Sequence, residues 1–194
     1  TGFHTDVVAA ALAEMRWGAA AGLKDLAYIT VGTGVGVGVL AGGCPLEGLS
    51  HSEMGHMRIS RYHEDHWIGD CPFHGDCLEG LVSGKAIGAR MGRPAETLAA
   101  SDPIWQTVAH SLGQLLHNIV LTGVPRRIIM GGGVMLGNDH LMGQVRAAML
   151  ESLAGYIPYD EVLCVDTFVV RAKLGNRAGT LGSIILGQQA LLRG

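Results

Sequence analysis

The stretch from residue 27 to residue 40, AYITVGTGVGVGVL, is the starting point for predicting the fold of the chain. Two apolar runs, 27–31 and 37–40, flank the glycine-rich segment 32–36, and this pattern predicts a β-hairpin. Backbone N–H groups of such a turn can approach phosphate oxygens, and the Thr33 hydroxyl can add a donor. An ordinary glycine-rich hairpin explains the same letters, because the Lys and Ser/Thr of a P-loop do not follow and neither does a helix.

Helical and strand patterns alternate on both sides of this hairpin. Upstream, the alanine-rich residues 6–21 predict a helix that Thr5 or Asp6 caps. Downstream, we expect helices over 81–91, 104–123, 138–154 and 179–192, and strands over 127–130 and 162–170. This succession predicts an α/β fold. Cys164 falls within the last predicted strand, so we expect it in the core.

The composition indicates one large globular domain or two small ones. Of the 194 residues 48% are apolar and 5% aromatic, so aliphatic side chains must fill the core. The net charge is -3, and no basic stripe for nucleic acid or polybasic membrane patch is visible. The first six residues lack the pattern of a signal peptide, and no apolar run is long enough to span a bilayer. We therefore expect a cytoplasmic protein that binds neither nucleic acid nor membranes.

The most specific motif is CPFHGDC at 71–77. Two thiolates and one imidazole within seven residues can wrap a tetrahedral Zn²⁺ ion. These ligands are Cys71, His74 and Cys77. A fourth ligand must come from elsewhere: His56 is the natural candidate, and His63 and His66 are rivals. Four protein ligands leave no position for a reacting water, so the ion would be structural. The alternative is a loop with two reduced cysteines and a surface histidine.

Two carboxylates, Glu53 and Glu79, flank the metal motif. Carboxylates bind sugar hydroxyls well, because each accepts several charge-assisted hydrogen bonds. A zinc ion that holds His56 and Cys77 would also position both carboxylates. Taken alone, the two glutamates are more simply explained as solvated surface residues.

Two further features are compatible with nucleotide chemistry. Residues 131–133 are three glycines between a predicted strand and a predicted helix, where they can leave room for a base or a ribose; a plain strand-to-helix turn explains them equally well. Asp6 begins the first helix and could accept a proton from a substrate hydroxyl during phosphoryl transfer. Capping the helix is the more common task of an Asp at that position.

The order of these features resembles the ROK family of ATP-dependent sugar kinases over essentially the whole chain. The resemblance is carried by DVVAAALAE at 6–14, TVGTGVG at 30–36, EMGH at 53–56, the Cys/His loop with Glu79, Ser83-Gly84, and IMGGG at 129–133. The form CPFHGDCLEG at 71–80 resembles the fructokinase branch. The sequence departs from that branch at His4 and Val8, where Asp and Asn are usual.

The resemblance implies an actin-like, ribonuclease-H-like ATPase fold and the conversion of fructose to fructose 6-phosphate with Mg²⁺ and ATP. It implies that Asp6 is the catalytic base. The implied sugar-binding residues are Glu53, His56 and Glu79. The implied zinc ligands are His56, Cys71, His74 and Cys77. The implied nucleotide-binding residues are Gly32, Thr33, Gly34 and Gly36 for the phosphates, and Gly131, Gly132 and Gly133 for the adenosine.

The resemblance also implies that residues 1–194 form the C-terminal sugar- and nucleotide-binding lobe, with a zinc loop at about 50–80. We expect the family's N-terminal lobe, with its Asp-x-Gly-Gly-Thr phosphate loop, to be missing, and the isolated chain to have negligible activity. Relatives of this kind are commonly homodimers. Two alternatives are a sugar-binding ROK regulator and a zinc-stabilised fragment without turnover; Asp6 and the fructokinase-like metal loop favour the kinase.

Overall fold

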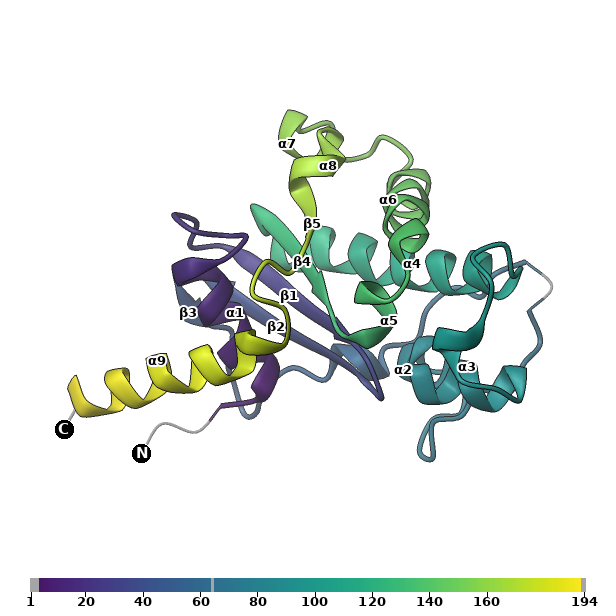
Figure 1. Cartoon of the computed structure of the whole chain (residues 1–194). Coiled ribbons are helices and arrows are strands. Elements are labelled where there is room, and N and C mark those ends of the chain that lie inside the picture. Colours follow the sequence, from purple (N-terminus) through teal and green to yellow (C-terminus); the bar gives the residue numbers. More distant parts are fainter. Residues whose placement is uncertain (1–3, 64, 193–194) are drawn as a thin grey trace.

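A five-stranded mixed sheet with helices on both faces forms the centre of the computed structural model, which describes residues 4–63 and 65–192 (Figure 1). The strands are β1 (Leu26–Val31), β2 (Val35–Ala41), β3 (Cys44–Pro45), β4 (Arg127–Gly131) and β5 (Val169–Arg171). Their spatial order is β3-β2-β1-β4-β5. The predicted α/β class and the predicted hairpin, formed by β1 and β2, are therefore confirmed.

The register of the sheet brings the two glycine-rich segments to one edge. β1 pairs antiparallel with β2, so that Val31 lies opposite Val35 across the turn at 32–34. β1 pairs in parallel with β4, and Thr30 lies opposite Gly131. Because parallel strands end on the same side of a sheet, the turn at 32–34 and the glycines at 131–133 lie next to each other.

Each face of the sheet has its own apolar core. Along β1, Leu26 and Tyr28 face α1 (Asp6–Trp17) and α9 (Ala178–Leu192), whereas Ala27 and Ile29 face the opposite side. That opposite core is covered by α4 (Ile104–Gly123) and α6 (Asp139–Leu153), with the short α5 (Gly133–Leu136) following β4. The alternation follows from the two-residue period of a strand that is buried on both faces.

The first helix is shorter than predicted. Thr5 is its N-cap, because the Val8 N–H donates to Thr5 Oγ1 at 3.3 Å. The helix ends at Trp17 rather than at residue 21. The Glu14 carboxylate accepts the Ala19 N–H at 2.6 Å, and the Glu14 carbonyl accepts the Gly18 N–H at 3.0 Å. The bond from Ala19 to the Glu14 side chain takes the place of the main-chain bond that would continue the helix.

The predicted helix over 81–91 is two helices in the structure. α2 (Leu78–Val82) and α3 (Gly84–Met91) are separated at Ser83, whose Oγ accepts the Ala86 N–H at 3.1 Å. A side-chain cap of this kind starts a new helix, so the axis changes direction there.

The predicted strand over 162–170 is mostly wrong. The segment forms two short helices, α7 (Asp160–Leu163) and α8 (Val165–Phe168), and only β5 at its end pairs with β4. Cys164 lies between the two helices and is exposed, so the expectation that it belongs to the core is also wrong. An apolar run alone does not distinguish a strand from short helices with one buried face.

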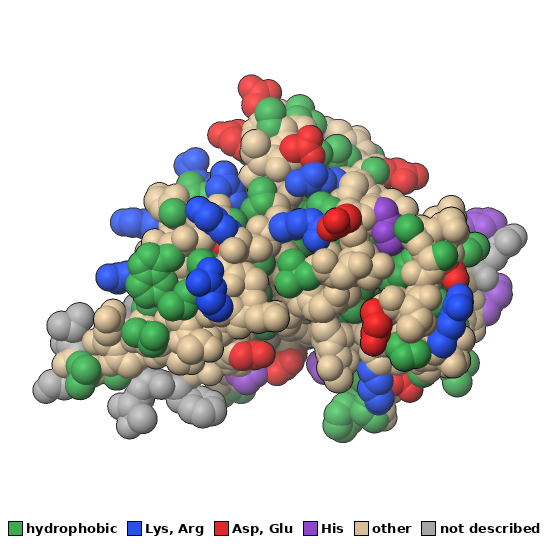
Figure 2. Space-filling view, in the orientation of Figure 1, with side chains coloured by type: hydrophobic (Ala, Val, Ile, Leu, Met, Phe, Trp, Pro, Cys, Tyr) green, Lys and Arg blue, Asp and Glu red, His purple; other side chains and the backbone are tan. Residues whose placement is uncertain are grey.

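None of the helices in the described residues is long and apolar enough to cross a membrane. Acidic and basic side chains are interspersed over the face shown in Figure 2. Thr1–Phe3, on which the argument against a signal peptide partly rests, lie outside the described residues.

Candidate functional site

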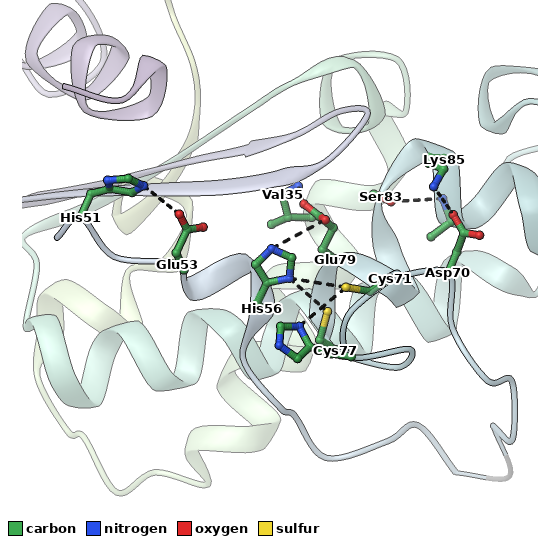
Figure 3. Close-up of polar contacts among 12 residues, drawn as sticks. Val35, His51, Glu53, His56, Asp70, Cys71, Cys77, Glu79, Ser83 and Lys85 are labelled. Atoms are coloured by element: carbon green, nitrogen blue, oxygen red, sulfur yellow. Dashed lines mark hydrogen bonds and ion pairs between the residues drawn. The ribbon is translucent and has the colours of Figure 1, made fainter. Parts of the chain in front are cut away.

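Four side chains from two segments of the chain converge on one point below the hairpin. The ligand atoms of His56, Cys71, His74 and Cys77 all lie within 4.8 Å of one another. His56 Nδ1 is 3.7 Å from Cys71 Sγ and 3.5 Å from Cys77 Sγ (Figure 3). His74 Nδ1 is 3.7 Å from Cys71 Sγ. The rivals His63 and His66 are not members of this cluster.

These separations fit a tetrahedral zinc ion. Zn–S bonds of about 2.3 Å and Zn–N bonds of about 2.0–2.1 Å at tetrahedral angles place sulfur and nitrogen about 3.6 Å apart. The three sulfur–nitrogen distances of 3.5–3.7 Å agree with that edge length. The set of two thiolates and two imidazoles is also one that Zn²⁺ prefers, so the four residues present fit the ion.

Tight backbone turns build the metal loop. Cys71 and Gly75 exchange both backbone hydrogen bonds, at 3.1 and 2.9 Å, across a turn in which Gly75 has φ +62°. Gly80 lets the loop close on α2, because a Cβ atom there would lie 2.0 Å from the Gly75 carbonyl oxygen. The short 3-10 helix Met54–His56 reaches the loop through its next residue, Met57, whose carbonyl accepts the Leu78 N–H at 3.0 Å. The chain thus supplies His56 from one segment and three ligands from another.

The two thiols have different electrostatic surroundings. Burial raises the pKa of Cys71, but hydrogen bonds from the backbone of Phe73 and His74 and from the side chains of Cys77 and His74 together lower it to about 6. Burial raises the pKa of Cys77, and the neighbouring charges of Cys71 and Glu79 raise it further. A bound divalent cation would stabilise the thiolate form of both cysteines, because only the thiolate is a metal ligand.

The two predicted sugar carboxylates lie in different surroundings. Glu79 is half-buried: its Oε2 accepts the Val35 N–H at 2.9 Å, and its Oε1 lies 4.0 Å from His56 Nε2. Glu53 is 66% exposed and pairs with His51, with an Oε1–Nε2 distance of 2.7 Å. Figure 3 shows both on the side of the metal cluster that faces the hairpin. Glu79 therefore belongs to the centre of the site and Glu53 to its rim.

A cavity of about 450 Å³ lies at the edge of the sheet where β1 and β4 end. Among the predicted nucleotide-binding residues it is lined by Gly32, Thr33 and Gly133. The sequence interpretation missed three polar side chains that also line it: Lys85, Glu96 and Asn138. The position of Lys85 directly after the Ser83-Gly84 pair was the only sequence signal that could have indicated its place in the site. Glu96 and Asn138 lie in segments without a motif.

The other predicted glycines have packing neighbours. A Cβ atom on Gly34 would lie 2.6 Å from Glu79 Oε2, and one on Gly36 would lie 2.7 Å from a methyl carbon of Val7 in α1. A Cβ atom on Gly131 would lie 2.6 Å from the Tyr28 hydroxyl oxygen. Gly132 has φ +87°, and any side chain there would collide with the backbone of β1.

Asp6 is exposed at the start of α1 and faces a second, smaller cavity of about 170 Å³. Its Oδ1 accepts the Val7 N–H at 2.9 Å. Tyr28, Thr30 and Gly132 line the same cavity. Burial raises the pKa of Tyr28 to about 12, with added contributions from the charges of Glu14 and Asp6. Two nearby residues depart from the pattern of the fructokinase branch. His4 pairs with Glu47, with an Nδ1–Oε1 distance of 2.5 Å, and Val8 is buried.

Comparison with known proteins places the chain in a family. Residues 1–190 match the ROK family. The chain is 40% identical to the fructokinase of Zymomonas mobilis, with 96% of this chain and 62% of the relative covered. It is 38% identical to the fructokinase of Pediococcus pentosaceus, with 96% of this chain and 64% of the relative covered. The chain thus spans less than two thirds of the length of these relatives.

A solved structure supports the same placement. The ROK family glucokinase of Streptomyces griseus, determined in complex with glucose and AMPPNP, superposes with a TM-score of 0.75 and 26% identity. The match covers 96% of this chain and 67% of that protein. Fold, metal cluster and sequence agree, and this chain belongs to the ROK family.

Proposed function

We propose that this chain is the C-terminal lobe of a kinase that transfers the γ-phosphate of ATP to fructose and forms fructose 6-phosphate. One observation carries the proposal: Asp6 and Gly132 line one cavity, and Gly32, Thr33 and Gly133 line another, at the end of the sheet where β1 and β4 run side by side. Phosphoryl transfer needs a base for the acceptor hydroxyl beside a cradle for the nucleotide. The fructokinases among the relatives favour fructose as the acceptor.

In this proposal the residues divide the work between the two substrates. Asp6 accepts the proton of the sugar hydroxyl as that oxygen attacks the γ-phosphate. The backbone N–H groups of Thr33 and Gly34 hold phosphate oxygens, and Gly133 gives the adenosine room. Mg²⁺ arrives with ATP and neutralises phosphate charge during transfer. The carboxylates of Glu53 and Glu79 accept hydrogen bonds from the sugar hydroxyls, and the His56 ring donates one to a sugar oxygen.

The metal cluster has a structural task in this proposal. Four protein ligands leave the ion without an open position, so it would fix His56 and the start of α2 rather than activate a substrate.

We also propose that the complete kinase adds an N-terminal lobe with a second phosphate loop, acts in the cytoplasm and forms a homodimer. The share of the relatives that the chain covers is consistent with such a lobe.

A coupled assay of the full-length protein with fructose and MgATP tests the proposal. We expect turnover with fructose at a higher kcat/KM than with glucose or mannose, and negligible turnover by residues 1–194 alone. Sugar binding without ADP formation would favour the regulator instead. Strong turnover by residues 1–194 alone would contradict the need for a second lobe.

A further inference from the structure

The Glu79 carboxylate lies between two parts of the molecule, the hairpin of β1 and β2 on one side and the metal cluster on the other. Its Oε2 accepts the Val35 N–H at 2.9 Å, a contact that spans 44 positions of sequence. Its Oε1 lies 4.0 Å from Nε2 of His56 (Figure 3). One oxygen therefore holds the hairpin and the other faces the metal cluster.

On the hairpin side, the carboxylate fixes the turn at 32–34 from outside. Val35 is the first residue after this turn, which the Gly32 N–H closes by donating to the Gly34 carbonyl at 2.9 Å. A Cβ atom on Gly34 would lie 2.6 Å from Glu79 Oε2, so the carboxylate reaches the backbone only because residue 34 is a glycine. The N–H of Gly84, five residues after Glu79, donates to the Gly32 carbonyl at 2.7 Å. Both ends of the turn are thus held by the segment 79–84.

On the metal side, two of the predicted ligands lie close to the same carboxylate. His56 directs Nδ1 toward the two sulfur atoms and therefore presents Nε2 to Glu79. A carboxylate beside the second ring nitrogen is the usual arrangement around a metal-bound histidine. Cys77 is the N-cap of α2 and lies two residues before Glu79 on the same element. A metal ion that fixes His56 and Cys77 would consequently fix the Glu79 carboxylate.

We propose that Glu79 is a positioning residue that couples the metal centre to the conformation of the turn at 32–34. An occupied metal centre holds the carboxylate against the Val35 N–H, and this contact keeps the turn in the shape that receives phosphates. The part of the inference that concerns nucleotide affinity rests on the proposed function, because it assumes that the turn at 32–34 holds ATP phosphates. A side chain that served the sugar alone would need no bond to Val35.

The first test measures the turn directly. Hydrogen exchange of the full-length protein is followed at the Val35 amide, for wild type, Glu79→Ala, Glu79→Gln and Glu53→Ala, with zinc content measured in each. A hydrogen bond to a charged group contributes about 1.5–3 kcal/mol, so Glu79→Ala should accelerate exchange on the order of 10-fold or more. Glu79→Gln keeps an acceptor oxygen and should remain close to wild type. Glu53→Ala removes the rim carboxylate, which does not contact the turn, and should change nothing at Val35.

The second test removes zinc from the wild-type protein with a chelator, which requires no substitution at Glu79. Exchange at Val35 should accelerate, and the affinity for a non-hydrolysable ATP analogue without sugar should fall on the order of 10-fold, both in the stripped protein and in zinc-loaded Glu79→Ala. Unchanged exchange at Val35 in Glu79→Ala, or after complete zinc removal, would overturn the coupling. A wild-type protein that binds no analogue and phosphorylates no hexose would contradict the proposed function instead, and the exchange at Val35 would still decide the coupling.

Discussion

Arg90 in α3 donates to Asp65 with an Nη2–Oδ1 distance of 2.9 Å, and the Asp65 side chain is only 3% exposed. Arg61 pairs with the other oxygen of Asp65 at 3.1 Å. Arg90 also lies over the ring of Trp67, 5.6 Å from its centre. This ion pair therefore fastens the irregular segment before the metal loop to a helix of the core.

Replacing Asp65 with Ala should destabilise the fold. Removing one partner of a buried ion pair costs about 3–5 kcal/mol, and here Arg61 and Arg90 stay 26% and 22% exposed, so we expect about 1–3 kcal/mol. Urea unfolding measures the loss. Asp166→Ala is the matched control, because Asp166 pairs with Arg146 but is 83% exposed; its effect should stay within about 0.5 kcal/mol. Equal effects of the two substitutions would contradict the anchoring role of Asp65.

The same ion pair gives stability a defined pH dependence. Burial raises the pKa of Asp65, but hydrogen bonds from Arg90, the Trp67 N–H and Arg61, with the charge of Arg90, together hold the pKa below its ordinary value. A carboxyl with a lowered pKa stabilises the fold fully above its unfolded pKa, and this contribution disappears as the pH falls through the folded pKa. The stability difference between wild type and Asp65→Asn should thus be constant from pH 7 to pH 5 and shrink below about pH 4.

The metal cluster predicts one zinc ion per chain. Cys71→Ser and Cys77→Ser should lose the ion, and a chelator should lower the melting temperature by about 10 °C, because a structural zinc contributes directly to folding. Cys44→Ser and Cys164→Ser serve as controls, since both cysteines are exposed and lie outside the cluster. Elemental analysis and thermal unfolding measure the two effects. Full zinc content in the Cys71 and Cys77 variants would disprove the site.

Gly182 in α9 should tolerate no side chain. A Cβ atom there would lie 1.9 Å from the carbonyl oxygen of Ala9, so Gly182→Ala would force α9 away from α1 and cost about 1–3 kcal/mol. Gly187 lies in the same helix with open space around it, and Gly187→Ala should stabilise by about 0.5–1 kcal/mol through helix propensity alone. Urea unfolding compares the two variants. If both shifted stability in the same direction, the close contact between the helices would be in doubt.

Local sequence signals explain why much of the fold was predictable. The Thr5 cap, the hairpin and the helix that begins after Asp102 depend on neighbours within a few positions; Ile104 N–H, for example, donates to Asp102 Oδ1 at 3.1 Å. Contacts between distant segments left no such signal. Glu14 is fully buried in α1, where its carboxylate binds the Leu174 N–H across 160 positions, and no pattern near residue 14 indicates this.

The candidate site follows the same rule. Three predicted metal ligands lie within seven residues, so their spacing was enough to predict them, whereas His56 was the natural candidate for the fourth ligand but had two rivals. The Glu79 contact with Val35 and the position of Lys85 at the cavity depend on how α2 and α3 dock against the hairpin. Docking is set by packing across the whole core, which a single stretch of sequence does not encode.

The rim carboxylate Glu53 gives a test of the sugar site that is independent of the turn at 32–34. Losing a charge-assisted hydrogen bond costs about 1.5–3 kcal/mol, so Glu53→Ala in the full-length protein should raise the fructose KM about 10- to 100-fold and leave the ATP KM nearly unchanged. Glu161→Ala is a control, because Glu161 is an exposed residue of α7. Steady-state kinetics with each substrate varied measures the effect. An unchanged fructose KM would make Glu53 an ordinary surface residue paired with His51.

Asp6 carries the most direct test of the chemistry. Its Oδ1 accepts the Val7 N–H, which leaves Oδ2 for a substrate hydroxyl in the cavity shared with Tyr28 and Thr30. Asn at this position keeps the acceptor oxygen toward Val7 but does not take up a proton. Asp6→Asn in the full-length protein should therefore lower kcat by about 10²- to 10⁴-fold, the usual contribution of a general base, while the fructose KM and the melting temperature change little. Asp139→Asn is the matched control, because Asp139 also starts a helix and is 96% exposed. A kcat within about 3-fold of wild type for Asp6→Asn would exclude Asp6 as the base, since a general base contributes far more than that factor.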